Sequence, residues 1–153
     1  MPAIRTAVKA LILREGRLLL NHCRNAGGEY YALPGGGQQV GEPLDVALVR
    51  ECREEIGVTV DVGPLCFVRD HIVANHQHSY VTESPHQLEL LFLCTLPPGE
   101  EPRLGPEPDS QQLDIAWLDA HEMQSVTLKP SWLVDVVRAG GIGTLSVYQG
   151  DRD

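Results

Sequence analysis

The stretch that decides the fold covers residues 36–58 and reads GGQQVGEPLDVALVRECREEIGV. It joins a glycine-rich turn to the clearest helix in the sequence, which we expect over residues 43–56. Pro43 suits the first turn of a helix, and Gly57 suits the left-handed position that ends one. The turn enters this helix only a few residues later.

One face of this helix changes from apolar to acidic along its length. At about 100° per residue, Leu44 and Leu48 share a face with Glu51, Glu54 and Glu55. The leucines should pack inward, so the three carboxylates point the same way near the end of the helix. Carboxylates at this spacing repel one another, and partial burial adds a desolvation cost for each charge.

A cation is therefore expected among the carboxylates. Arg50 and Arg53 lie at about −100° and −160° from Glu51, so we expect them to flank the acidic cluster rather than fill it. A hard divalent cation, Mg²⁺ or Mn²⁺, prefers oxygen ligands and would balance the charge. The alternative is a solvated acidic helix face. The glycines of residues 35–37 favour the cation, because they let backbone groups approach a ligand closely.

The same stretch resembles the Nudix box, G-x5-E-x7-R-E-U-x-E-E-x-G-U, in which U is an aliphatic residue. The residues that fit are Gly36, Glu42, Arg50, Glu51, Glu54, Glu55, Gly57 and Val58. Cys52 replaces the first aliphatic residue, a small apolar change that should affect only packing. The segment YALPGGG at residues 31–37 and the pair Trp117-Leu118 are also similar to this family.

The resemblance implies a single Nudix hydrolase domain over residues 1–153, with an α/β/α sandwich built on a mixed β-sheet. The coarse pattern of the chain agrees, because strand-like segments alternate with two or three helical ones. Asp119 and Glu122 predict a capping box for a short helix. Residues 144–148 are expected to form an edge strand.

Further strands are expected from runs of branched and apolar residues. Residues 4–13 and 17–22 predict a hairpin. Residues 58–74 predict two strand pieces, separated at Gly63-Pro64. Residues 88–96 predict a strand that is covered on both faces. Residues 97–108 are rich in proline and predict a surface loop.

By motif position, the resemblance implies a divalent-metal-dependent hydrolase of a nucleoside diphosphate linked to another group X. Its catalytic residues would be Glu51, Glu54 and Arg50, and its metal ligands would be Glu51, Glu54, Glu55 and the Gly36 carbonyl. The bound metal would neutralise the phosphates and lower the pKa of an attacking water. Glu42 and Gly57 would be structural, and Arg50 with Glu42 would brace the loop against the helix.

The general base is open at this point. Glu51 is the first choice, and the alternative is a residue from a late loop, as in some family members. The polar residues available there are Asp109, Gln111, Gln112 and Asp114. That loop has no glutamate between residues 109 and 114, which favours Glu51.

Several residues outside the box are candidates for contacts with substrate. Arg24 and Arg69 could hold phosphates, and Glu89 interrupts an otherwise apolar strand. The alternatives are a solvated arginine and a glutamate that faces a polar neighbour. His76 and His78 are spaced to share a strand face and could bind zinc, but the segment around them offers no further clustered donor.

The composition limits the class of partner. Twelve basic residues against 21 acidic ones give a net charge of −9, which argues against a nucleic acid polymer or an anionic membrane as partner. No apolar stretch approaches the length of a membrane span or a signal peptide, so we expect a cytoplasmic protein. The four cysteines form no C-x-x-C pair and predict buried, reduced thiols.

Three function classes remain distinct. The leading one is hydrolysis of a small phosphorylated substrate, with nucleoside triphosphates, nucleotide sugars and ADP-ribose-like compounds all open. A non-catalytic nucleotide-binding sensor on the same fold is the alternative, although such modules tend to lose the carboxylates. Isomerisation of an isoprenyl diphosphate is a third class, disfavoured by the short chain. The family resemblance also leaves open that the protein forms a homodimer, since homodimers are common in this family.

Overall fold

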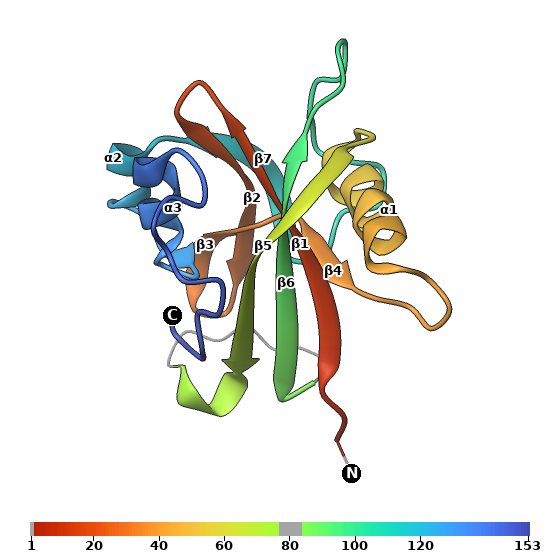
Figure 1. The fold of residues 1–153 in the computed structure, drawn as a ribbon, viewed down its shortest axis with the longest axis vertical. Helices are drawn as coiled ribbons and strands as arrows, with labels where there is room; N and C mark the ends of the chain where they lie inside the picture. The colour runs from red at the N-terminus through yellow and green to blue at the C-terminus, as the bar shows by residue number, and fades with distance from the viewer. Residues whose placement is uncertain (1, 77–83) are drawn as a thin grey trace.

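A computed structural model of the chain describes residues 2–76 and 84–153 (Figure 1). The strands are β1 (Arg5–Arg14), β2 (Arg17–Asn25), β3 (Gly28–Ala32), β4 (Gly35–Gly37), β5 (Asp61–Ile72), β6 (His86–Thr95), β7 (Gln112–Leu118) and β8 (Leu128–Lys129). The helices are α1 (Leu44–Ile56), α2 (Ala120–Met123), α3 (Leu133–Ala139) and a 3₁₀ turn (Val73–Asn75). No helix within this part of the chain is long and apolar enough to cross a membrane.

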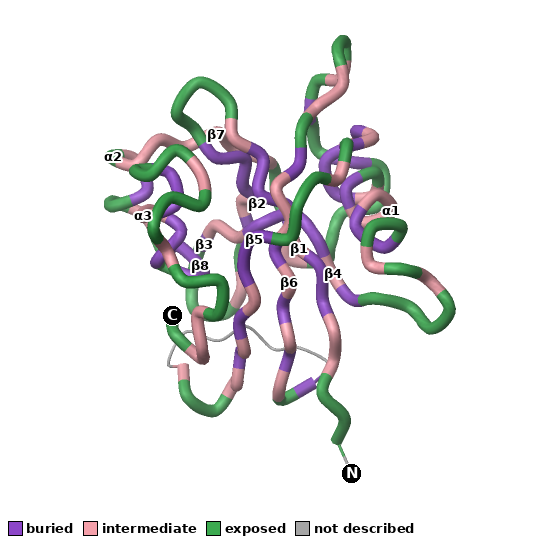
Figure 2. Tube along the Cα trace, viewed as in Figure 1, coloured by how far each residue is buried: buried purple, intermediate pink, exposed green. Residues whose placement is uncertain are grey.

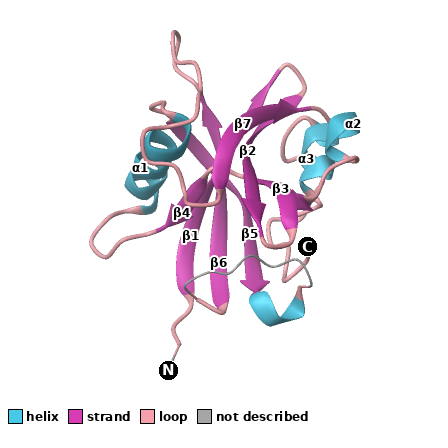
Figure 3. Ribbon diagram, turned by 180° about the vertical axis from the view of Figure 1, so that it is seen from behind, coloured by secondary structure: helices cyan, strands magenta, loops and turns pink. Residues whose placement is uncertain are grey.

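The strands form a mixed sheet, as the sequence predicts. Its main order is β5-β6-β1-β2-β3-β8, with β4 paired to β1 and β7 paired to β2. β1 runs parallel to β6 and antiparallel to β2 and β4. Helix α1 lies on one side of the strands and α2 with α3 on the other, so the expected α/β/α layering is confirmed (Figures 1 and 3).

Alternate residues of β1 supply two separate cores. Val8, Ala10 and Ile12 pack with Leu48 of α1, whereas Leu11 packs on the opposite side with the α3 cluster around Leu133. This alternation follows from the period of two in a strand, and it lets one strand support both helical layers. Figure 2 shows the resulting pattern, with buried residues along the central strands and exposed residues in the loops.

The ends of α1 confirm the sequence prediction. The helix begins after Pro43 and ends at Gly57, whose φ of 66° lies in the left-handed region. The hairpin of β1 and β2 and the capping box of Asp119 and Glu122 are likewise present. The four cysteines are free and buried.

Two strand predictions were wrong. Residues 61–72 form one continuous strand, because shifts of register between Val62 and Phe67 absorb the Gly63-Pro64 pair. β5 is an edge strand, where proline and bulges are tolerated. Residues 144–148 form no strand but make an isolated bridge from Tyr148 to Val68.

The loop after β6 is held by the last turn of α1. The backbone N–H groups of Arg103, Gly105 and Glu107 donate to the carbonyls of Ile56, Glu55 and Glu54, at 3.0, 2.9 and 3.0 Å. Carbonyls in the last turn of a helix have no partner within the helix, so the loop satisfies them. A Cβ on Gly105 would lie 2.2 Å from the Glu54 carbonyl oxygen, which explains the glycine.

We predict that Gly105→Ala destabilises the fold by about 1–3 kcal/mol, because the new methyl group collides with backbone rather than with a movable side chain. Urea denaturation followed by circular dichroism measures this change. Gly27→Ala is the matched control, since the added Cβ would meet only the Asn25 side chain at 3.3 Å. Equal stability of the two variants would contradict the role given to the loop.

Candidate active site

A cavity of about 410 Å³ opens beside the acidic end of α1. α1 contributes Glu51, Glu54 and Glu55, and β4 contributes Gly35, Gly36 and Gly37. Residues of β1, β2, β3 and β6 also line the cavity, and the loop before β7 adds Glu107, Asp109, Ser110 and Gln111. The structure therefore brings together the carboxylates and Gly36, which the family resemblance implies belong to one site.

Arg50 lies at the centre of the acidic cluster. Its Nη1 donates to Glu51 Oε1 at 2.9 Å and lies 3.4 and 3.5 Å from the two carboxylate oxygens of Glu54. The expectation that Arg50 only flanks the carboxylates was wrong. A helical angle places the Cα atom, whereas the long arginine side chain carries its charge back across the helix surface.

The same guanidinium joins the helix to the turn that precedes it. Nε and Nη2 of Arg50 donate to the two carboxylate oxygens of Glu42 at 3.1 and 2.7 Å, and Nη2 also donates to the Gly37 carbonyl at 3.0 Å. Hydrogen bonds to Glu42 and Glu51 raise the pKa of Arg50. The hydrogen bond between Arg50 and Glu42 in turn lowers the pKa of Glu42. Both groups therefore keep their charge at neutral pH.

Glu55 is the most buried carboxylate of the cluster. Its Oε1 accepts from the Gly35 backbone N–H at 2.7 Å and from Asn21 Nδ2 at 3.3 Å. Burial raises the pKa of Glu55 to about 7, against the lowering effect of the Lys9 charge. Glu55 thus links α1 to β4 and β2 at the base of the cavity.

Glu51 fits against the middle glycine of β4. A Cβ on Gly36 would lie 2.6 to 2.7 Å from the Glu51 carboxylate, so any side chain there would displace it. Burial raises the pKa of Glu51, opposed by its hydrogen bond to Arg50. The glycine therefore provides the space that the carboxylate occupies.

The donors at this site suit a hard divalent cation, because they are carboxylate and carbonyl oxygens. Within residues 2–76 and 84–153, however, no three acidic, histidine or cysteine groups stand close enough together to hold one ion. Arg50 instead supplies the positive charge between Glu51 and Glu54. The oxygen donors are thus of the chemical type that binds a divalent ion and line one cavity, although their side chains do not converge on a single point.

The late loop contributes to the cavity, partly as the sequence indicated. Asp109 and Gln111 line it, and Gln111 accepts a hydrogen bond from the Tyr30 hydroxyl. Gln112 instead donates to the Glu55 carbonyl at 2.9 Å inside the fold. Glu107 also lines the cavity and was not anticipated. Only its attachment to the helix end brings it there, and no motif in the sequence indicates that contact.

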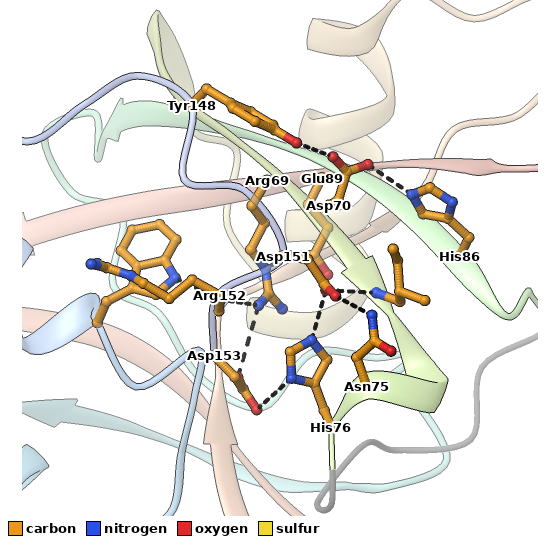
Figure 4. Close-up of polar contacts among 12 residues, drawn as sticks. Arg69, Asp70, Asn75, His76, His86, Glu89, Tyr148, Asp151, Arg152 and Asp153 are labelled. Carbon is orange, nitrogen blue, oxygen red and sulfur yellow. Dashed lines mark hydrogen bonds and ion pairs between the residues drawn. The ribbon is translucent and has the colours of Figure 1, made fainter.

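The three residues outside the box that were candidates for substrate contacts, Arg24, Arg69 and Glu89, do not line the cavity. Arg24 is exposed and ion-pairs with Glu29 at 2.5 Å. Arg69 and Glu89 pair with each other at 2.6 Å, with side chains only 1% and 3% exposed, and neither lines the cavity (Figure 4). Burial acts to raise the pKa of Glu89, but the charge of Arg69 holds it below its usual range. Glu89 therefore faces a polar neighbour, the alternative considered for it.

Of the two histidines considered as zinc ligands, the structure describes only His76. His76 Nε2 lies 2.7 Å from Asp151 Oδ1 (Figure 4). The His76 ring stacks on that of His71, with centroids 5.2 Å apart. His78 lies outside the described residues. The contacts of His76 join the end of β5 to residues near the end of the chain.

Comparison with known proteins identifies the family. The family model described as "NUDIX domain" matches residues 3–138. Nucleoside triphosphatase NudI of Enterobacter sp. (strain 638) is 30% identical over 142 residues, covering 89% of this chain and 96% of the relative. Putative ADP-ribose pyrophosphatase YjhB of Bacillus subtilis (strain 168) is 27% identical over 99 residues, covering 65% of this chain and 45% of the relative.

A solved structure agrees with the sequence relatives. The crystal structure of a MutT NUDIX hydrolase from Burkholderia pseudomallei matches with a TM-score of 0.68 and 27% identity, covering 86% of this chain and 95% of that one. Residues 3–138 of this chain include every residue that lines the cavity. On these grounds the chain belongs to the NUDIX family.

Proposed function

We propose that this chain hydrolyses a phosphoanhydride bond in a small nucleoside diphosphate derivative and requires a divalent metal ion, Mg²⁺ or Mn²⁺. The observation that carries the proposal is the shared cavity, which is lined by Glu51, Glu54 and Glu55 of α1 together with Gly36. Carboxylates gathered at a cavity that can admit a ligand differ from a solvated helix face, where each charge would meet only water.

The metal ligands in this proposal are Glu51, Glu54, Glu55 and the Gly36 carbonyl. When bound, a divalent ion would neutralise phosphate charge and lower the pKa of the attacking water. Glu51 would accept the proton of that water, because its carboxylate lines the cavity, within reach of a bound ligand. Arg50 is a positioning residue here, since it holds Glu51 and Glu54 in place while Glu42 holds Arg50.

The relatives support the substrate class without choosing within it. One is named a nucleoside triphosphatase and another a putative ADP-ribose pyrophosphatase. The substrates in both names contain a nucleoside joined to two or more linked phosphates. A panel of nucleoside triphosphates, nucleotide sugars and ADP-ribose, tested with Mg²⁺ and with Mn²⁺ and analysed for products, would identify the substrate and the bond cleaved.

We predict that Glu54→Gln lowers kcat/KM on the best substrate by about 100-fold or more, because loss of even an outer partner of a metal costs up to that factor. Glu15→Gln, an exposed change in the β1–β2 turn, is the control for loss of one acidic charge. The measurement is release of phosphate product at saturating metal. Full turnover by the Glu54 variant would exclude the proposed site, and ligand binding without turnover in the wild type would favour a sensor.

A second prediction tests the packing of Glu51. In Gly36→Ala the new methyl group would occupy the position of the Glu51 carboxylate. We expect kcat/KM to fall by roughly 10- to 100-fold, as for disturbed metal ligands. The melting temperature should change little, because the displaced group is the end of a flexible side chain. Wild-type activity in this variant would show that Glu51 is not needed in its observed place.

A further inference from the structure

Lys9 is a cation inside the cavity that the box does not account for. It is one of only two lysines in the chain, and it lies on β1 between two almost fully buried residues, Ala7 and Leu11. Lys9 lines the cavity together with Arg5 of the same strand face. A charged residue between two buried apolar side chains calls for a partner.

The first and last glycines of β4 lie beside these two cations. A Cβ on Gly35 would collide with the Val8 carbonyl oxygen at 2.0 Å and would lie 3.0 Å from the Lys9 side chain, whereas a Cβ on Gly37 would lie 2.3 Å from the Arg5 guanidinium. Because side chains alternate along a strand, these two glycines face the opposite way from Gly36 and its neighbour Glu51. The β4 strand therefore has carboxylate on one face and cations on the other, with the cavity reaching both.

The charge of Lys9 affects three carboxylates, but each of them already forms a hydrogen bond with another group. The Lys9 charge acts to lower the pKa values of Glu51, Glu55 and Glu89. Glu51 is bonded to Arg50, Glu55 to the Gly35 N–H and Asn21, and Glu89 to Arg69. Across the described part of the chain, no ion pair or hydrogen bond involves the Lys9 ammonium.

We propose that Lys9 is a specificity-determining residue that binds a substrate phosphate beyond the two phosphates of the diphosphate group. This inference rests on the proposed function, because it assumes that the cavity holds a nucleotide. An ammonium is a compact charge with three donors and is well suited to phosphate oxygens. The carboxylate side of the cavity would require a metal to accept phosphate, whereas the Lys9 side accepts it directly.

A purely structural Lys9 would act differently. If its charge served only to offset Glu55 and Glu89, its removal would lower the stability of the protein and weaken all substrates alike. A phosphate-binding Lys9 changes the ratio of affinities for ligands that differ by one phosphate. That ratio is the quantity to measure, because a general loss of stability leaves it unchanged.

The test uses two non-hydrolysable probes that differ by one phosphate, α,β-methylene-ADP and α,β:β,γ-bismethylene-ATP, with Mg²⁺ and titration calorimetry. The proteins are the wild type, Lys9→Met, Lys9→Arg and the control Arg17→Met, which removes an exposed positive charge at the start of β2, outside the cavity. The wild type should bind the triphosphate probe more tightly. Lys9→Met should lose that preference by about tenfold, the scale of a hydrogen bond to a charged group.

The outcomes separate the two proposals. The role of Lys9 is supported if Lys9→Arg and Arg17→Met keep the preference for the triphosphate probe and Lys9→Met loses it. A raised KM of Lys9→Met for a triphosphate substrate, at nearly constant kcat, also supports that role. An unchanged preference in Lys9→Met, in a protein whose wild type hydrolyses nucleotides, overturns the role of Lys9 and leaves the proposed function standing. A wild type that neither binds the probes nor hydrolyses any nucleotide overturns both.

Discussion

The arrangement of the site depends on the guanidinium of Arg50. It contacts Glu42 in the turn, the carbonyl of Gly37 in β4, and Glu51 and Glu54 on α1. One planar group with five donors can serve these acceptors at once, which lysine cannot do. The turn, the strand and the helix are thereby fixed relative to one another, and the carboxylates are held near each other despite their repulsion.

Charge is distributed around the cavity in layers. The helix side is acidic and contains Arg50 as its internal counter-charge, whereas the β1 side carries Arg5 and Lys9. Glu55 lies between the two, bonded to β4 and β2. The overall charge of −9 therefore does not describe the surface that a ligand meets, because the cavity offers both signs within a small volume.

The sequence predicted the features that depend on local pattern. The ends of α1, the β1–β2 hairpin, the capping box and the mixed sheet follow from periodicity, caps and turn residues. The sequence did not predict features that depend on the length of a side chain or on contacts between distant parts of the chain. The angle of Arg50 on the helix did not reveal where its long side chain ends, and the partner of Glu89 is twenty residues away on another strand. Sequence alone also could not place Glu107 in the cavity, since backbone hydrogen bonds to α1 bring it there.

Those backbone hydrogen bonds divide the loop after β6 into two parts with different freedom to vary. Between Arg103 and Glu107 the chain is in register with three successive carbonyls of α1, so an inserted or deleted residue would shift every bond at once. Before Arg103, where residues 97–101 contain a proline pair and a glycine turn, no such register exists. Changes of length should accumulate in the earlier part, leaving the wall of the cavity unaltered while the outer surface diverges.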